Sequence, residues 1–299
     1  YRAGRGGGRD LGDKQARGFC RLCQWRNAMK LLLLGGTADA RKVTRELDEQ
    51  GLLQISDTDK DRLKLIYSIA GLVRSPQVPC EVISGGFSQY GGLSVCLKVN
   101  GIDAILDVTH PFAEKMSNTA VTAARQCNIP CWRFHRPAWT KQAGDCWQLF
   151  ENWQELIPAL AGKKTVLLTA GQLDQSLIDQ LVEQAKVTSA EGQTQQLILR
   201  TAAPPRATLP DSIIWIKALG PFKEADELAL FNEYQVDVVV SKNSGGAATE
   251  AKLTAARKLG VEVMMLQRPT FDAADRQFST VIECVDWLKQ HLLKKKTGQ

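Results

Sequence analysis

Short runs of hydrophobic residues alternate along this 299-residue chain with segments whose apolar positions recur at helical spacing. From Met29 onward the apolar runs predict strands at residues 30–34, 65–70, 102–108, 130–134, 165–169, 197–202, 213–217, 236–240 and 261–266. The helical spacing predicts helices at residues 39–50, 114–127, 174–185, 224–233, 247–259 and 281–292. Continuously apolar strands that alternate with helices are typical of an α/β fold with parallel sheets covered on both faces.

The second half of the chain repeats the order of the first. Residues 103–137 and 237–269 each contain a strand, a turn, a helix that carries Thr-Ala-Ala-Arg, another strand and an Arg-Pro pair. We therefore expect two Rossmann-like domains with a ligand cleft between them. The first would be a nucleotide-binding domain at residues 29–137, and the second a substrate-side domain at residues 138–293.

The two ends of the chain carry most of its positive charge. The formal net charge is +6, but residues 1–28 hold seven Arg or Lys and two Asp, and residues 294–296 are three lysines, so the rest of the chain carries −2. Residues 1–28 are rich in Gly and Arg without apolar periodicity, which predicts a disordered extension, and residues 294–299 form a basic tail. A near-neutral folded part argues against a nucleic-acid partner.

Two further features bear on location and metal binding. No apolar run approaches the roughly 20 residues of a membrane helix, so we expect no membrane contact and a cytoplasmic location. Cys20 and Cys23 have metal or redox spacing, but no second pair and no histidine lies near them. We expect no metal site, and the other cysteines are expected to be reduced and mostly buried.

A glycine turn follows the first predicted strand. Gly35, Gly36 and Thr37 come directly after four leucines, where a turn into a helix brings backbone N–H groups close to a diphosphate. The usual G-x-G-x-x-G order is incomplete, so a plain strand–helix turn is the alternative. Arg74 follows the second strand, where an arginine suits the 2′-phosphate of NADP. Four glycines at residues 85–92 predict a loop, which is either close to a ligand or a plain connection.

Polar residues also follow two equivalent strands of the repeat. Thr109, His110 and Pro111 end the strand at residues 102–108, at the edge where parallel sheets bind ligands. A histidine there can exchange a proton near neutral pH, while a capping or packing role is the alternative.

The second copy has a Lys-Asn-Ser-Gly-Gly turn in the same place. Lys242, Asn243, Ser244 and Gly245 lack the order of a phosphate loop, but a lysine and bare N–H groups suit any anion, including a carboxylate. Phe222 ends another strand of that half. These residues predict a second crevice, separate from the nucleotide turn.

The order of these motifs resembles that of the precorrin-6A reductase family of cobalamin biosynthesis, which includes cobalt-precorrin-6A reductase. The similarity runs from Met29 to about residue 291 and includes GGTADAR, DVTHPFA, Arg-Pro-x-Trp, Gly-Pro-Phe and SKNSGG. It implies a monomeric reductase that transfers a hydride from NADPH or NADH to one double bond of a macrocycle edged with carboxylates, giving precorrin-6B or its cobalt form. Relatives often have glycine where this chain has Ala38, and residues 1–28 and 52–64 fall outside the pattern.

The resemblance also implies roles for individual residues. Two would be catalytic: His110 and Lys242. The cofactor would be held by Gly35, Gly36, Thr37, Arg74, Thr109 and Pro111. The substrate would be bound by Lys242, Asn243, Ser244, Gly245, Arg136 and Phe222. The resemblance does not fix which residue protonates the macrocycle, whether the donor is NADPH or NADH, or whether the substrate already contains cobalt.

Two other functions compete with this interpretation. A short-chain-type reductase would need a Tyr-x-x-x-Lys pair, and none of the four tyrosines has a lysine four positions later. A non-enzymatic nucleotide-binding domain would need no second polar crevice, and the residues at the strand ends of the second half argue against it.

Overall fold

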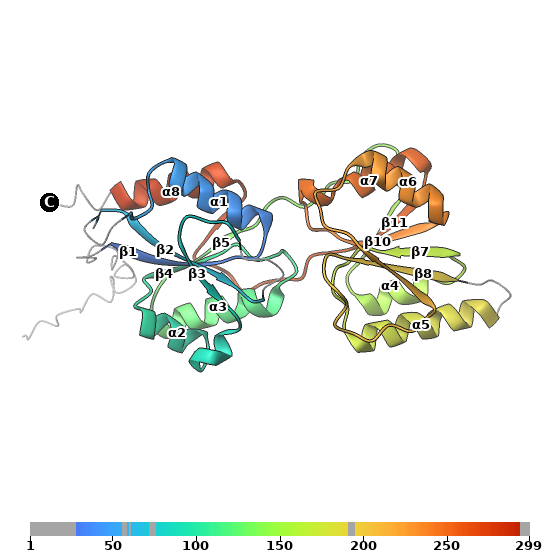
Figure 1. Cartoon of the computed structure of the whole chain (residues 1–299), viewed down its shortest axis with the longest axis horizontal. Helices are drawn as coiled ribbons and strands as arrows, with labels where there is room; N and C mark the ends of the chain where they lie inside the picture. Colours follow the sequence, from blue (N-terminus) through green and yellow to red (C-terminus); the bar gives the residue numbers. More distant parts are fainter. Residues whose placement is uncertain (1–27, 56–58, 60, 72–75, 191–194, 294–299) are drawn as a thin grey trace, which may run out of the picture.

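The computed structural model describes residues 28–55, 59, 61–71, 76–190 and 195–293. The chain forms two lobes placed end to end, each built around a six-stranded sheet (Figure 1). All strand pairs recorded in these residues are parallel, which confirms the predicted α/β fold with two parallel sheets. The predicted extension, apart from Ala28, and the predicted basic tail lie outside the described residues, as do Arg74, Cys20 and Cys23.

The two sheets have equivalent strand orders. The first is ordered β12-β5-β4-β1-β2-β3 and the second β6-β11-β10-β7-β8-β9. The strands of the first sheet are β1 (Met29–Leu34), β2 (Leu63–Ile69), β3 (Glu81–Ser84), β4 (Ala104–Asp107), β5 (Cys131–Phe134) and β12 (Arg276–Phe278). Those of the second are β6 (Trp147–Phe150), β7 (Thr165–Leu168), β8 (Gln196–Thr201), β9 (Ile213–Lys217), β10 (Val238–Lys242) and β11 (Glu262–Leu266).

Helices cover both faces of each sheet (Figure 1). In the first lobe, α1 (Ala38–Glu49) and α8 (Val281–Leu293) lie on one face, and α2 (Leu93–Asn100) and α3 (Glu114–Cys127) on the other. In the second, α6 (Glu224–Tyr234) and α7 (Ala251–Leu259) lie opposite α4 (Trp153–Ala159) and α5 (Gln175–Ala190). Two 3₁₀ turns are η1 (Phe87–Tyr90) and η2 (Ala247–Thr249).

The four leucines of β1 show why its sequence is continuously apolar. Leu31 and Leu33 pack under α1 and α8, whereas Leu32 and Leu34 pack under α2 and α3. Successive side chains of a strand point to opposite faces, so a strand with helices on both sides needs apolar residues at every position.

The internal repeat corresponds to equivalent units of the two sheets. Residues 103–137 contain β4, α3 and β5, and residues 237–269 contain β10, α7 and β11. These strand pairs occupy the same two places in their sheets. In both units the chain then leaves its lobe along an Arg-Pro segment.

The lobes exchange their edge strands. After β5 the chain crosses to the second lobe, where β6 pairs with β11; after β11 it returns, and β12 pairs with β5. Phe278 of β12 and Leu288 of α8 are buried in the core of the first lobe. The predicted second domain at residues 138–293 is therefore wrong at its C-terminal end, because β12 and α8 complete the first lobe.

The elements that the sequence did not predict are short or lie at sheet edges. Three of the strands, β3, β6 and β12, are edge strands of three or four residues, and each exposes part of its length, so none produces an apolar run. The glycine-rich segment at residues 85–92 contains η1 and leads into α2, with Gly91 in the left-handed conformation at φ +81°. Residues 52–64, which fall outside the pattern of the resemblance, include structured positions, because Leu53 is buried and bridges Leu63.

Candidate functional site

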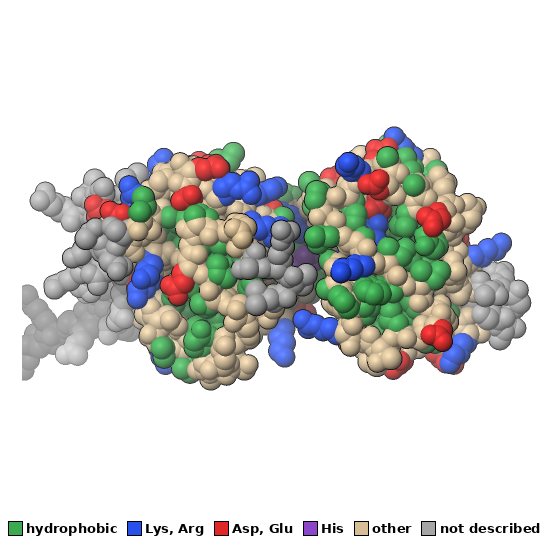
Figure 2. Space-filling model, viewed as in Figure 1, with side chains coloured by type: hydrophobic (Ala, Val, Ile, Leu, Met, Phe, Trp, Pro, Cys, Tyr) green, Lys and Arg blue, Asp and Glu red, His purple; other side chains and the backbone are tan. Residues whose placement is uncertain are grey.

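The carboxyl ends of β4 and β5 face those of β10 and β11 across the seam between the lobes. Arg136, which follows β5, donates through Nε to the carbonyl of Ser244 at 2.6 Å, and Arg268, which follows β11, donates through Nη1 to the carbonyl of Arg136 at 2.8 Å. Phe112, which follows β4, packs against the core of the second lobe, and its ring centroid lies 5.6 Å from Lys242 Nζ. Figure 2 shows histidine atoms at this seam with Lys and Arg side chains near it.

The predicted nucleotide turn leads from β1 into α1. A Cβ on Gly35 would lie 2.4–2.7 Å from two ring carbons and the hydroxyl oxygen of Tyr67, so this position requires glycine. The N–H of Gly36 donates to the Tyr67 hydroxyl at 3.2 Å. The Thr37 hydroxyl caps α1 by accepting from the N–H of Ala40, and it donates to the carbonyl of Val108.

These bonds define how the turn can hold a diphosphate. The Gly36 N–H and the Thr37 hydroxyl already have protein partners, so they shape the turn rather than offer free donors. The N-terminus of the 12-residue helix α1 opens at the same edge, and its first-turn N–H groups have no carbonyl partner within the helix. The residues present therefore fit a diphosphate through the helix end.

A buried ion pair supports the loop after β4. Asp107 accepts from Arg133 Nε at 3.2 Å, and both side chains are 2% exposed. The other oxygen of Asp107 accepts from the N–H and the hydroxyl of Thr109, at 3.1 and 2.6 Å. Arg133 also donates to the carbonyl of Asp272, in the segment that returns from the second lobe. Predicted cofactor residue Thr109 is thus part of a buried network, and Pro111 beside it is buried.

His110 projects from this loop and keeps exposed surface. Its Nδ1 accepts from the N–H of Phe112 at 3.3 Å, and the two rings lie 5.9 Å apart. The pKa of His110 is lowered to about 4, first because the surrounding protein removes water from the ring and then because Arg136, Lys242 and other cations face it. This lowered pKa favours the neutral ring near neutral pH. The role of His110 in proton exchange stays a prediction.

Two segments cross between the lobes, residues 135–146 and 267–275, and we call them the crossings. The Lys-Asn-Ser-Gly-Gly turn holds them together. The Asn243 amide accepts from the N–H of Trp139 at 2.8 Å and donates to its carbonyl at 3.1 Å. Arg268 donates to the carbonyls of Asn243 and Ser244. A Cβ on Gly245 would lie 1.8 Å from the carbonyl oxygen of Pro137.

Among the predicted substrate residues of this turn, Lys242 brings a positive charge to the seam. Lys242 contacts the ring of Phe112, and burial lowers the pKa of its ammonium. Arg136 is engaged with Asp39 of α1 as well as with Ser244. The structure therefore brings Lys242, Arg136 and His110 together.

Comparison with known proteins identifies the family. The model of the family described as Precorrin-6x reductase CbiJ/CobK matches residues 30–289. The chain belongs to this family. It is 34% identical to precorrin-6A reductase of Rhodococcus erythropolis, over 87% of this chain and 97% of the relative, and 26% identical to cobalt-precorrin-6A reductase of Priestia megaterium, over 81% and 91%. A solved structure of CobK precorrin-6A reductase is 32% identical, covers 88% of this chain and 97% of its own, and superposes with a TM-score of 0.72.

The match places this precorrin-6x reductase among oxidoreductases that act on a carbon–carbon double bond. In the described part of the chain, no helix has the length and apolar character of a membrane span. The same residues contain no group of three or more His, Cys, Asp or Glu that could hold a metal ion.

Phe222 lies apart from the contacts that join the lobes. It follows β9 of the reductase, and the guanidinium of Arg200 lies 4.4 Å from its ring centroid. Arg200 also pairs with Glu227 at 2.7 Å, and both side chains are largely buried. The N–H of Phe222 donates to the carbonyl of Ala248 in η2, next to the turn after β10.

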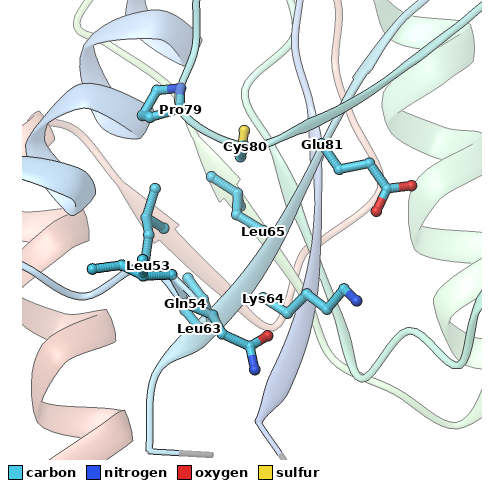
Figure 3. Close-up of a pocket in the computed structure, with 9 residues that line it drawn as sticks. Leu53, Gln54, Leu63, Lys64, Leu65, Pro79, Cys80 and Glu81 are labelled. Carbon is cyan, nitrogen blue, oxygen red and sulfur yellow. The ribbon is translucent and has the colours of Figure 1, made fainter. Parts of the chain in front are cut away.

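A further pocket lies elsewhere in the reductase. A cavity of about 280 Å³ is lined by the starts of β2 and β3 and by the segment after α1, including Leu53, Lys64 and Cys80 (Figure 3). It is at the amino ends of these strands, opposite the edge where parallel sheets bind ligands. Burial raises the pKa of the Cys80 thiol to about 12, so this cysteine is unreactive. The cavity is therefore separate from the candidate site.

Lys252 of α7 is a buried cation that the sequence did not single out. Its side chain is 4% exposed, its Nζ lies 5.1 Å from the Trp139 ring centroid, and burial lowers its pKa to about 7. A lysine in the unfolded chain has a pKa of about 10.4. Between about pH 7 and about pH 10, the unfolded state therefore binds more protons than the folded state. Wild-type stability therefore rises with pH from about 7 to about 10.

Lys252→Met is expected to stabilise the reductase by about 1–4 kcal/mol below pH 7, because it removes a buried ammonium and keeps the side-chain volume. The gain should shrink as the pH approaches 10. Urea unfolding of both proteins across this pH range measures it. A variant that is less stable than wild type at every pH would show that the ammonium has a stabilising partner.

Proposed function

We propose that this chain reduces one double bond of precorrin-6A with a hydride from NADPH, giving precorrin-6B. The observation that carries the proposal is the contact between the carboxyl ends of the two sheets, which we call the two ligand edges. The loop with His110 follows β4 of the first lobe, and its Phe112 contacts Lys242, the last residue of β10 of the second lobe. A donor held on the first lobe and a macrocycle held against the second would therefore meet at the seam.

The nucleotide would lie along the carboxyl edge of the first sheet. The α1 N-terminus, shaped by Gly35, Gly36 and Thr37, would hold the diphosphate, and the loop of Thr109 and Pro111 would lie near the nicotinamide. Arg74 lies outside the described residues, and its predicted pairing with the ribose 2′-phosphate is the reason to favour NADPH over NADH. When bound, the reduced nicotinamide supplies a hydride.

The macrocycle would lie against the second lobe. It is flat and carries carboxylates, and Lys242 and Arg136 present positive charge to the seam. Phe112 offers an apolar face at the same place. Asn243, Ser244 and Gly245 would support the substrate indirectly, because their polar groups hold the crossings. Phe222 would contribute at the rim, next to η2.

The metal-free substrate is favoured by the relatives. Those named precorrin-6A reductase are 30–34% identical to this chain, and those named cobalt-precorrin-6A reductase are 24–29% identical. We further propose that the enzyme acts as a monomer, because one chain supplies both edges of the seam. Six free cysteines in the described residues suit the reducing cytoplasm.

Turnover tests the proposed function. Residues 29–299 are incubated with precorrin-6A or cobalt-precorrin-6A and with NADPH or NADH, and the absorbance of the reduced nicotinamide is followed. We expect the fastest loss of absorbance with precorrin-6A and NADPH, and none when the tetrapyrrole is left out. If none of the four mixtures reacts, the proposed activity is wrong.

A further inference from the structure

The charged groups that act on His110 are unusual in having one sign. Within the described residues they are Arg136 after β5, Lys242 of β10, Lys252 of α7 and Arg268 after β11. We call Arg136, Lys242 and Arg268 the cationic cluster and leave out Lys252, because burial lowers its pKa to about 7. They come from both lobes, so the cluster exists only because the two ligand edges meet.

Little negative charge compensates the cluster. Arg136 pairs with Asp39, but Arg268 donates to three main-chain carbonyls, those of Arg136, Asn243 and Ser244. The recorded contact of Lys242 is the ring of Phe112. Such a site favours the binding of an anion and disfavours a further positive charge on an imidazole.

The hydrogen bonding of His110 defines which ring nitrogen is available. Nδ1 accepts from the N–H of Phe112, so a neutral ring carries its proton on Nε2. A charged ring would carry protons on both nitrogens and would lose this bond. This hydrogen bond therefore favours the neutral ring, in agreement with the direction of the pKa of His110.

We infer that His110 takes up a proton when the anionic macrocycle binds and then delivers that proton to the substrate. The inference rests on the proposed function. Each macrocycle carboxylate that pairs with Lys242 or Arg268 cancels a positive charge facing His110, so the cost of charging the ring falls. Substrate binding would thus convert the neutral ring into the acid that the reaction needs.

The step balances in atoms and electrons. The hydride forms a new C–H bond at one end of the substrate double bond and brings two electrons, so the nicotinamide is oxidised. The π electrons of that bond move to the other end and take the proton from His110, which becomes neutral. One proton is drawn from solvent for each turnover, and it enters when the substrate binds.

Nuclear magnetic resonance of ring-labelled histidine tests the inference directly, because the chain has three histidines. The ring signals are titrated with pH in the protein alone, with NADP⁺, and with NADP⁺ plus precorrin-6A, a mixture without reducing equivalents. We expect His110 to be neutral at about pH 7 in the first two samples and mostly protonated in the third. His291, stacked on Trp287 in α8, is the internal control and should not change.

Two results would overturn the inference. The first is a His110 ring that stays neutral in the third sample. The second is protonation by NADP⁺ alone, which would assign the cationic cluster to the nucleotide phosphates. Turnover of the same preparation is measured separately. Reduction of precorrin-6A with a neutral His110 contradicts only this inference, whereas a preparation that neither binds nor reduces precorrin-6A contradicts the proposed function as well.

A variant provides a second test. His110→Gln keeps a polar side chain and should lower kcat for precorrin-6A by about 10²- to 10⁴-fold, the usual contribution of a positioned acid, while KM changes little. The pH dependence of kcat that remains should lack the ionisation of His110. A variant with the pH profile of the wild type would contradict the inference.

Discussion

Gly245→Ala is expected to destabilise the enzyme by about 2–5 kcal/mol and to abolish most of its activity. Gly245 has φ +68°, a conformation that costs a non-glycine residue about 1–2 kcal/mol. The new methyl group would also lie 1.8 Å from the carbonyl oxygen of Pro137 and 2.8 Å from Arg268 Nη2. Since neither the main chain nor the bonded guanidinium can simply rotate away, the two crossings must separate, which adds about 1–3 kcal/mol.

Gly260→Ala is the matched control. Gly260 ends α7 at φ +67°, but a Cβ there meets nothing within 4 Å. Urea unfolding should show only the conformational cost for Gly260→Ala, and its activity should remain near that of the wild type. Equal effects of the two substitutions would show that the close approach of Gly245 to Pro137 is unimportant.

Asp107→Ala is expected to cost about 3–5 kcal/mol, because it leaves the guanidinium of Arg133 buried without a counter-charge. It also removes the acceptor of the Thr109 N–H and hydroxyl, so the loop before His110 should lose its fixed position. Both unfolding free energy and kcat are measured. We expect kcat to fall even at temperatures where the variant is fully folded.

An exposed ion pair serves as the reference for Asp107. Glu183 and Lys186 of α5 are paired at 3.3 Å, but their side chains are 70% and 69% exposed. Glu183→Ala should therefore change stability very little. If Asp107→Ala is as mild as Glu183→Ala, the buried pair does not support the loop.

The central part of each sheet was predictable because burial on both faces leaves a simple pattern. The leucines of β1 and the valines of β10 face helices on both sides, so every position is apolar. The Arg-Pro pairs of the repeat correctly located two equivalent units. The repeat could also have identified Arg268, because it is the counterpart of the predicted residue Arg136.

The strand exchange was not predictable from the same pattern. Local periodicity describes which face of an element is apolar, but not which sheet that face covers. Either lobe could bury the apolar side chains of Phe278 and Leu288. Only the folded structure shows that they pack in the core of the first lobe. The edge strand β12 has three residues, of which two are exposed.

For the candidate site, the sequence predicts polar residues at the strand ends, and the structure shows which of their groups already have partners. The polar residues at the strand ends do gather at the seam, as the sequence suggested. Asn243 and Ser244, however, hold the crossings, and the Thr37 hydroxyl caps α1. A motif shows which donors a turn carries, whereas partners distant in sequence decide which donors remain for a ligand. Tyr67 and Trp139 are such partners.

The central claim is that the nucleotide binds the first lobe and the macrocycle the second. Lys242→Ala tests it most directly, with Lys217→Ala as control, since Lys217 is an exposed lysine at the end of β9 of the same sheet. We measure the Kd of NADP⁺ and the KM of precorrin-6A. For Lys242→Ala we predict that KM rises about 10- to 100-fold, as expected for the loss of a charge-assisted hydrogen bond, while the Kd of NADP⁺ stays within about twofold. A collapse of NADP⁺ binding with an unchanged KM would show that the two ligand sites are reversed.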